Sequence, residues 1–146
     1  MKNRGFTLIE ILIVLGIIAV LMTMVILTVN PARQFAQVRN TQRWSNLNSI
    51  LSAIYQNMID NSGIFTCSAG ALATSTTVMG SGTGQYDICS CLVPTYMASM
   101  PFDPSTGSYT NCSSYNSAYT VSQATSGRVS VAAPSAELGQ TIDLTR

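Results

Sequence analysis

The sequence predicts an α+β protein in which a long N-terminal helix, membrane-spanning in its first half, carries a small C-terminal antiparallel β-sheet. Three observations predict this fold class. An apolar stretch of about two dozen residues lies near the N-terminus, a stretch with helical periodicity follows it, and short β-prone runs between turn-forming residues make up the remainder. The 146 residues suit one modest domain attached to such a helix.

The composition excludes several function classes. Only 9% of the residues are charged, against roughly 25% in ordinary soluble domains, and the formal net charge is +1. No basic surface that would bind nucleic acid is therefore expected. Histidine is absent and Lys2 is the only lysine, so the commonest general bases and activated nucleophiles are missing. We expect a protein that is not an enzyme and that needs no cofactor.

Residues 6–29 form the apolar stretch, and Glu10 is their only charged side chain. At a rise of about 1.5 Å per residue, a helix of this length spans the roughly 30 Å hydrocarbon core of a bilayer. Apolar side chains are distributed on all sides of it, whereas a surface helix has a single apolar face. The stretch therefore predicts one membrane-spanning helix.

Basic residues indicate the orientation of this helix. Lys2 and Arg4 precede it and favour a cytoplasmic N-terminus, although Arg33, Arg39 and Arg43 follow it. The stretch is longer than the apolar core of a cleaved secretory signal, and no small-residue cleavage site follows it. We therefore expect the apolar stretch to remain in the protein.

An amphipathic helical segment comes next. Asn30 and Pro31 predict a bend or loosening where it starts, because proline lacks a backbone N–H and disfavours the helical conformation in its predecessor. Residues 61–63, Asn-Ser-Gly, form a stop signal. Residues 6–60 are thus expected to form one long helix with a single apolar stripe in its second half. The stripe consists of Phe35, Val38, Leu47, Ile50, Leu51, Ile54 and Met58.

The remaining residues predict a small sheet packed on this stripe. Residues 68–84 are small and polar without periodicity and are expected to form an exposed loop. Short β-prone runs follow at 91–93, 119–122 and 128–132, and the last two predict an antiparallel hairpin. Residues 100–107 are rich in turn formers and predict an ordered irregular loop.

Four cysteines, Cys67, Cys89, Cys91 and Cys112, all lie beyond the membrane span. Their even number predicts two structural disulfides in an oxidising compartment. Cys89 and Cys91 would share one face of a strand and are poorly placed to bond each other, so each is expected to reach Cys67 or Cys112. Both such pairings remain open at this point.

We expect no metal site. A zinc site of four cysteines is the alternative to disulfides, but the spacing lacks the paired knuckles typical of zinc frameworks. Asp87 and Asp103 lie in separate turn-rich segments and fall short of the six to eight oxygen ligands that calcium takes.

The N-terminus carries the most specific pattern. Residues 5–10, Gly-Phe-Thr-Leu-Ile-Glu, follow a short basic leader and run into the apolar helix. This arrangement resembles the class III signal of the type IV pilin superfamily, which includes the pseudopilins of type II secretion. The resemblance implies that a prepilin peptidase cleaves after Gly5 and methylates the new N-terminus at Phe6. One departure is that many pilins have a proline within the apolar stretch, whereas the first proline here is Pro31.

The resemblance also implies an organisation and a function. Residues 1–5 would be a cleaved leader, 6–30 a transmembrane and filament-core helix, 31–62 its amphipathic continuation, and 63–146 a globular β head. The chain would be a structural subunit of a type IV pilus and form a homopolymer in a helical filament. Its partners would be the membrane, the prepilin peptidase and assembly platform proteins. The precursor would lie in the bacterial inner membrane, and the filament would be periplasmic or extracellular.

Two alternatives remain open: a type II secretion pseudopilin and a membrane-anchored binding domain that does not polymerise. Glu10 bears on this choice, because a carboxylate in hydrocarbon costs roughly 2.5–3.5 kcal/mol and is expected to have a functional partner. Its own chain offers only the Phe6 amine after cleavage, with poor geometry. We expect the Phe6 amine of a neighbouring subunit to pair with Glu10 during assembly.

Overall fold

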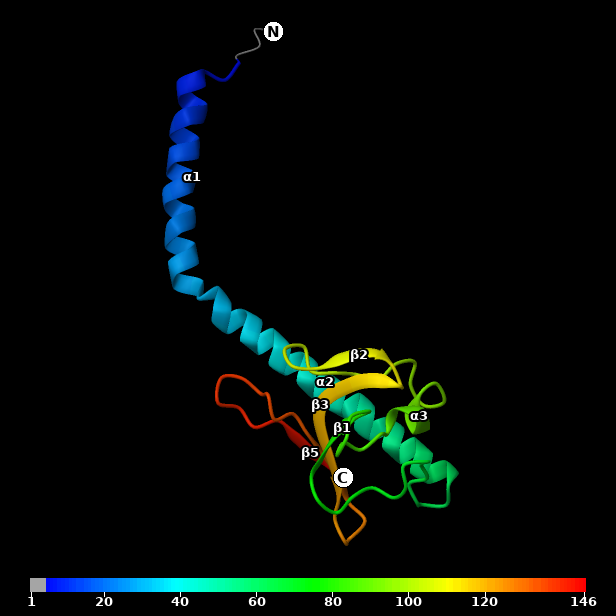
Figure 1. Cartoon of the computed structure of the whole chain (residues 1–146). Coiled ribbons are helices and arrows are strands. Elements are labelled where there is room, and N and C mark those ends of the chain that lie inside the picture. Colours follow the sequence, from blue (N-terminus) through cyan, green and yellow to red (C-terminus); the bar gives the residue numbers. More distant parts are fainter. Residues whose placement is uncertain (1–4) are drawn as a thin grey trace. The chain divides into compact units, whose positions relative to one another are not determined.

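The computed structural model describes residues 5–146 of the chain (Figure 1). The chain divides into two compact units, residues 1–35 and residues 36–146, and we call the second the head unit. Two long helices come first along the chain, and the short helix α3 and five β-strands follow them. The predicted α+β class is confirmed. Residues 1–4, part of the expected leader, lie outside the described residues.

Helix α1, Leu8–Val29, begins at the N-cap residue Thr7. Every described side chain of α1 is exposed. Among the described residues, the segment Leu8–Ile26 is the one helical stretch long and apolar enough to cross a membrane. Thr23 and Thr28 donate their hydroxyl protons to carbonyl oxygens one turn back, both at 2.9 Å, so these polar groups are satisfied inside the helix.

The expected single helix over residues 6–60 is wrong at Asn30. Asn30 adopts the left-handed conformation, with φ 42° and ψ 79°, and α2 starts afresh as Pro31–Asp60. Asparagine tolerates this conformation, and its Oδ1 accepts the N–H of Arg33 at 3.3 Å. Pro31 has no N–H to continue α1 but suits the first position of a new helix. The break therefore follows from the same two residues that predicted a bend.

The apolar stripe of α2 is confirmed in its centre and wrong at its start. Leu47, Ile50, Leu51 and Ile54 are fully buried, and Met58 packs partly buried at the edge of the core. Phe35 and Val38, in contrast, are 63% and 64% exposed. Over this first part, the buried face of α2 instead consists of Ala36, Asn40 and Arg43.

The end of α2 matches the predicted stop signal. The helix ends at Asp60, and Ser62 and Gly63 have positive φ values of 59° and 89°. The N–H of Gly63 donates to the carbonyl of Met58 at 2.7 Å, which satisfies one of the last carbonyl groups of the helix.

All strand pairs of the head unit are antiparallel, in the order β1-β3-β4-β5 with β2 also paired to β3. The predicted hairpin is confirmed as β3 and β4, which pair from Thr120 with Ala132 to Gln123 with Val129. The strands are β1 Thr77–Gly80, β2 Ser108–Asn111, β3 Ser114–Gln123, β4 Val129–Ala132 and β5 Asp143–Thr145.

Two predictions for the head unit are wrong. The expected loop 68–84 contains β1, whose Met79 is fully buried, so pairing with β3 outweighs the small polar residues around it. The expected strand 91–93 is instead helix α3, Cys89–Leu92, which buries Cys89 and Leu92 three residues apart on one helical face. Residues 100–107 form neither helix nor strand, as predicted.

The core of the head unit lies between α2 and the sheet. The buried stripe of α2 joins a cluster with Tyr119 and Val121 of β3 and with Val129 and Val131 of β4. Along β4 the buried valines alternate with half-buried residues, which is the pattern of a sheet with one covered face, whereas β3 also buries Thr120 between its two core residues. Asn40 and Arg43, on the buried polar face of α2, lie next to this core and form hydrogen bonds with other segments of the head unit.

Candidate functional site

The Gly5–Phe6 junction lies in an exposed segment ahead of α1. Residues 5–7 are not helical, and the Phe6 side chain is 78% exposed. No atom of the described residues lies within 4 Å of where a Cβ on Gly5 would be. The described part of the chain therefore leaves this peptide bond accessible and imposes no steric need for glycine at position 5.

Thr7 and Glu10 form a capping box at the start of α1. The Thr7 hydroxyl oxygen accepts the N–H of Glu10 at 3.3 Å, and the Glu10 carboxylate accepts the N–H of Thr7 at 3.4 Å. The expectation that the chain offers Glu10 only the Phe6 amine is therefore wrong. The signal was present in the sequence, because Thr-x-x-Glu ahead of an apolar run is the capping-box pattern.

These contacts leave the Glu10 carboxylate accessible. Its hydrogen bonds to Thr7 are long, at 3.4 and 3.5 Å, and the residue is exposed. A carboxylate has about four acceptor positions, so capping one helix end does not exhaust them. Glu10 can accept a further, charged donor without giving up its role at the helix start.

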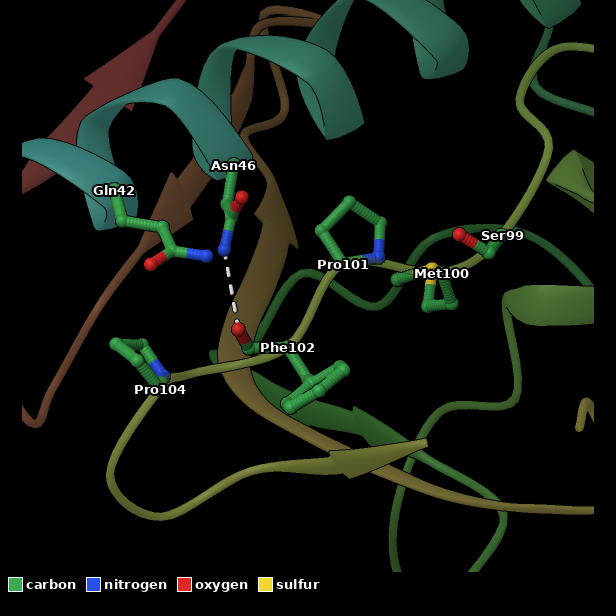
Figure 2. Close-up of a pocket in the computed structure, with 7 residues that line it drawn as sticks. All are labelled: Gln42, Asn46, Ser99, Met100, Pro101, Phe102 and Pro104. Carbon is green, nitrogen blue, oxygen red and sulfur yellow. Dashed lines mark hydrogen bonds between the residues drawn. The ribbon is translucent and has the colours of Figure 1, made fainter. Parts of the chain in front are cut away.

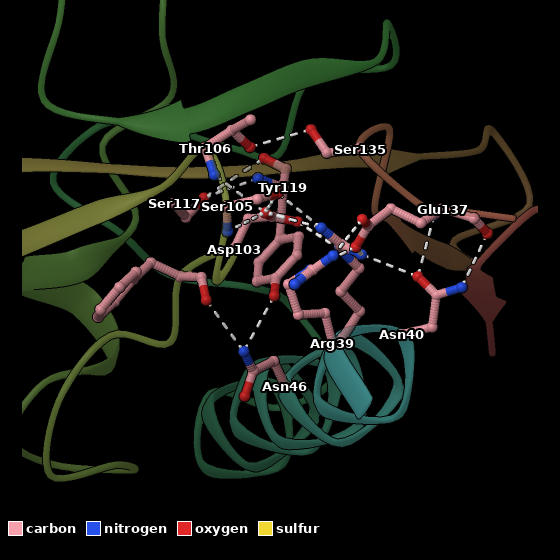
Figure 3. Close-up of polar contacts among 12 residues, drawn as sticks. Arg39, Asn40, Asn46, Asp103, Ser105, Thr106, Ser117, Tyr119, Ser135 and Glu137 are labelled. Carbon is pink, nitrogen blue, oxygen red and sulfur yellow. Dashed lines mark hydrogen bonds and ion pairs between the residues drawn. The ribbon is translucent and has the colours of Figure 1, made fainter. Parts of the chain in front are cut away.

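A second polar cluster fastens α2 to two loops of the head unit (Figure 3). Arg43 is completely buried, and its Nε and Nη2 donate to the two carboxylate oxygens of Asp103 at 2.6 and 3.1 Å. Asp103 also accepts the N–H and the hydroxyl proton of Ser105, at 2.8 and 2.7 Å. Loop 100–107 is thereby tied to the helix.

Glu137 extends the same cluster on its other side. Its carboxylate accepts two hydrogen bonds from Arg39, at 2.7 and 2.6 Å, and one from Arg43 at 2.8 Å. The amide of Asn40 binds the backbone of Glu137 twice, donating to its carbonyl at 2.8 Å and accepting its N–H at 3.0 Å. The segment between β4 and β5 is therefore held against α2 at this residue.

The contacts within this cluster favour the charged form of each of its acidic and basic side chains. Burial raises the pKa of Asp103, but hydrogen bonds from Arg43 and Ser105 outweigh it and hold this pKa well below its usual range. Hydrogen bonds from Arg39 and Arg43 lower the pKa of Glu137 to about 2. The hydrogen bond to Asp103 outweighs burial and raises the pKa of Arg43. Two cations thus balance two anions, and the cluster holds the fold together.

Comparison with known proteins concerns the first of these sites. Residues 1–26 match the family model of the prokaryotic N-terminal methylation motif. The chain carries the class III signal of type IV pilins and pseudopilins. No curated protein and no solved structure matches it. The matched segment contains the Gly5–Phe6 junction, the capping box and most of α1.

The pilin-type motif fixes the kind of protein at a coarse level. This motif is a structural pilin-type motif and not that of an enzyme family, and it implies processing by a prepilin peptidase and assembly into a pilus. Together with the apolar helix α1, it indicates membrane anchoring of the precursor.

Two disulfides are present, as the cysteine count predicts, and the structure distinguishes the two open pairings. Cys67 bonds Cys91, and Cys89 bonds Cys112, with 5.2 Å between the Cα atoms of each pair. Cys89 is fully buried and Cys91 half-buried, so the two side chains leave α3 toward different partners. A shared strand face, on which the sequence argument relied, does not exist there.

The acids considered for calcium are engaged elsewhere. Asp103 binds Arg43, and Asp87 accepts the hydroxyl proton of Tyr115 at 3.0 Å. Within residues 5–146, no group of three or more potential metal-ligating side chains occurs. The cation beside Asp103 in this fold is therefore a guanidinium group of the chain itself.

Proposed function

We propose that this chain is a structural subunit of a type IV pilus that polymerises through α1. One observation carries the proposal: within the methylation motif, an accessible Gly5–Phe6 junction directly precedes a helix whose apolar side chains are exposed. Such a subunit has two requirements. It needs a junction that a peptidase can reach and a helix whose apolar surface needs apolar partners.

Processing is the first step of the proposed function. A prepilin peptidase cleaves between Gly5 and Phe6 and methylates the new amine, which removes residues 1–5 as a leader. The non-helical conformation of residues 5–7 supports this step, because a peptidase needs an extended substrate. Gly5 has no described neighbour within 4 Å of an added Cβ, which supports the proposal that the peptidase, and not the fold, requires glycine at this position.

Polymerisation follows from the surface of α1. Burying one leucine, isoleucine or valine side chain is worth roughly 1.5–3 kcal/mol relative to water, so α1 cannot leave the bilayer uncovered. Copies of α1 packed in a central bundle supply the cover in a filament. The contact between successive subunits is head-to-tail, which gives an open helical polymer.

Glu10 sets the axial register in this proposal. The methylated Phe6 amine of a neighbouring subunit pairs with the Glu10 carboxylate, which keeps free acceptor positions beside Thr7. A subunit added out of register leaves two unpaired charges in an apolar bundle, and this penalty selects the correct step.

The location follows from the helix and the disulfides. The precursor spans the bacterial inner membrane with a cytoplasmic N-terminus, and assembly platform proteins move it into a periplasmic or extracellular filament. Two disulfides in the head unit support an oxidising compartment on the far side of the membrane. The role is structural, without enzymatic activity.

A type II secretion pseudopilin is the second candidate, since the matched motif belongs to both groups. Filaments sheared from cells and examined by electron microscopy and mass spectrometry test the proposal. We expect long surface filaments that contain this chain. Short periplasmic assemblies would favour the pseudopilin, and a chain found only as membrane-bound monomer would contradict both.

A further inference from the structure

The two disulfides of the head unit differ in how well a reagent can reach their sulfur atoms. In the first bond, Cys67 and Cys91 are both half-buried. In the second bond, Cys89 is completely buried and Cys112 is half-buried. A thiolate opens a disulfide by direct attack on one of its sulfurs, so access limits which sulfurs can react. The first bond therefore offers two sulfurs to an attacking thiolate, and the second bond offers one.

The surroundings of Cys91 suit a thiolate. The Ser68 and Ser90 hydroxyl oxygens lie 3.7 and 3.8 Å from the Cys91 sulfur, which is within hydrogen-bond reach of sulfur. Within residues 5–146, these two hydroxyls form no other hydrogen bond. A disulfide sulfur is a weak acceptor, whereas a thiolate is a charged acceptor and binds a donor more strongly. The two serines therefore stabilise Cys91 most when its sulfur carries a negative charge.

The surroundings of Cys67 suit a neutral thiol. Its sulfur lies 3.6 Å from the carbonyl oxygen of Asp87. A disulfide sulfur has no proton to donate, but a Cys67 thiol is a weak donor and can use this carbonyl. The residues on either side, Thr66 and Ser68, are exposed, so an attacking thiolate can approach Cys67 from solvent. Once the bond is open, the structure thus favours a thiol at Cys67 and a thiolate at Cys91.

The second disulfide lacks this arrangement. Within the described part of the chain, the hydrogen bonds to sulfur all involve Cys67 or Cys91. Attack on Cys112 would release Cys89 as a thiolate among the apolar side chains of the core, where burial disfavours the charged form. The Cys89–Cys112 bond is therefore protected both by limited access and by a poor leaving group.

We propose that Cys67–Cys91 is a thiol–disulfide exchange site for an external dithiol, and that Cys89–Cys112 is a lasting crosslink. A thiolate of the dithiol attacks the Cys67 sulfur, forms a mixed disulfide with it and releases Cys91 as a thiolate. The second sulfur of the dithiol then attacks the first one, and the reagent leaves as a disulfide. Its remaining proton passes through water to the Cys67 sulfur. Two electrons thus pass from the dithiol to the chain, and the reverse sequence closes the bond.

The head unit keeps α3 in place while the first bond is open. The Cys89–Cys112 bond still joins α3 to the turn after β2, and the Tyr115 hydroxyl of β3 accepts the N–H groups of Ile88 and Cys89 at 3.0 and 3.1 Å. Opening is therefore local, and the bond can close again. The groove beside Phe102 (Figure 2) has no cysteine among its lining residues, so it is not part of the exchange site.

Limited reduction of the purified full chain in detergent tests the order of opening. Dithiothreitol is the probe, and free thiols are alkylated at successive times and assigned by peptide mapping. We expect Cys67 and Cys91 to be alkylated about tenfold faster than Cys89 and Cys112. Equal rates, or earlier opening of Cys89–Cys112, would overturn the proposal. The measurement uses unassembled subunits, so its outcome is independent of the proposed function.

The monothiol glutathione tests which sulfur is attacked, because it cannot complete the second step. We expect glutathione bound to Cys67 in chains whose Cys91 is alkylated. Glutathione found on Cys91 instead would overturn the assignment of Cys91 as the leaving thiolate.

A double variant, Ser68→Ala with Ser90→Ala, tests the role of the two hydroxyls. It should slow the opening of Cys67–Cys91 on the order of fivefold, because the leaving thiolate loses both donors. The melting temperature of the oxidised chain should not change, since both serines are exposed. Ser113→Ala is the matched control, because Ser113 is exposed beside Cys112, and both bonds should open at wild-type rates. Opening of Cys67–Cys91 at the wild-type rate in the double variant would contradict this role.

Discussion

Arg43 and Asp103 form a doubly hydrogen-bonded ion pair in which both side chains are completely buried. They are 60 residues apart in sequence and join the middle of α2 to loop 100–107. A buried pair of this kind adds little stability over a well-packed apolar pair, but removal of one partner leaves an uncompensated charge. The pair therefore fixes where the loop docks on the helix.

Asp103→Asn should destabilise the head unit strongly. Arg43 keeps its burial but loses its main counter-charge, and a broken buried pair costs about 3–5 kcal/mol. Denaturant unfolding of the full chain in detergent, followed by tryptophan fluorescence of Trp44, measures the change. Asp143→Asn is the control, because Asp143 is exposed and should change stability by at most about 0.5 kcal/mol. Equal effects of both variants would contradict this role of the ion pair.

Acid should weaken the head unit below about pH 4. The pKa values of Asp103 and Glu137 are lower in the folded state than the unfolded values of about 4. The two carboxylates therefore stabilise the folded state fully only above their unfolded pKa of about 4. This stabilisation is lost as the pH falls through the folded-state pKa, which is about 2 for Glu137 and lower for Asp103. Between pH 4 and 2, the melting temperature of Glu137→Gln should fall less steeply with pH than that of the wild type. Parallel curves for the variant and the wild type would contradict the assignment.

Reduction of the disulfides should loosen the head unit without unfolding α2. The bonds close segments of 24 and 23 residues, for which loop-closure entropy gives about 3 kcal/mol each. Hydrogen exchange should rise over residues 64–112, while the stripe from Leu47 to Ile54 stays protected by the sheet. Peptide mapping without reductant should recover Cys67 linked to Cys91 and Cys89 linked to Cys112. Four alkylatable thiols in the exported protein would contradict this prediction.

Three variants at the start of α1 separate the charge of Glu10 from its capping role. Glu10→Gln keeps a side chain that can complete the capping box but removes the charge, and Thr7→Ala removes the cap but keeps the charge. If the charge sets the register, Glu10→Gln and Glu10→Ala should insert and be cleaved yet fail to enter filaments. Thr7→Ala, at a cost of about 1 kcal/mol to the helix end, should still assemble. Electron microscopy of sheared filaments gives the yield. Normal filaments from Glu10→Gln would show that the charge is not the register.

The sequence predicts those parts of the fold that depend on local pattern. The apolar stretch of α1, the stripe from Leu47 to Ile54 and the β3–β4 hairpin all have a period that can be counted. The capping box of Thr7 and Glu10 is an equally local pattern, Thr-x-x-Glu ahead of an apolar run. At Asn30, local pattern indicated a disturbance but not a complete break.

Other features depend on contacts that no local pattern encodes. Phe35 and Val38 fit the apolar stripe, yet Asn40 and Arg43 take the buried face because Glu137 and Asp103 reach it from far along the chain. Strand β1 has one fully buried apolar anchor, Met79, among small polar residues, so its pairing with β3 was not foreseeable. The choice between the two disulfide pairings likewise needed the position of α3.

The central claim is that this chain enters a filament only after cleavage between Gly5 and Phe6. Intact mass and N-terminal fragment spectra of subunits from sheared filaments test it most directly. We predict a chain that begins at Phe6 with a methylated amine, and a Gly5→Leu variant that accumulates in the membrane as uncut precursor. Filament subunits that still begin at Met1 would contradict the account.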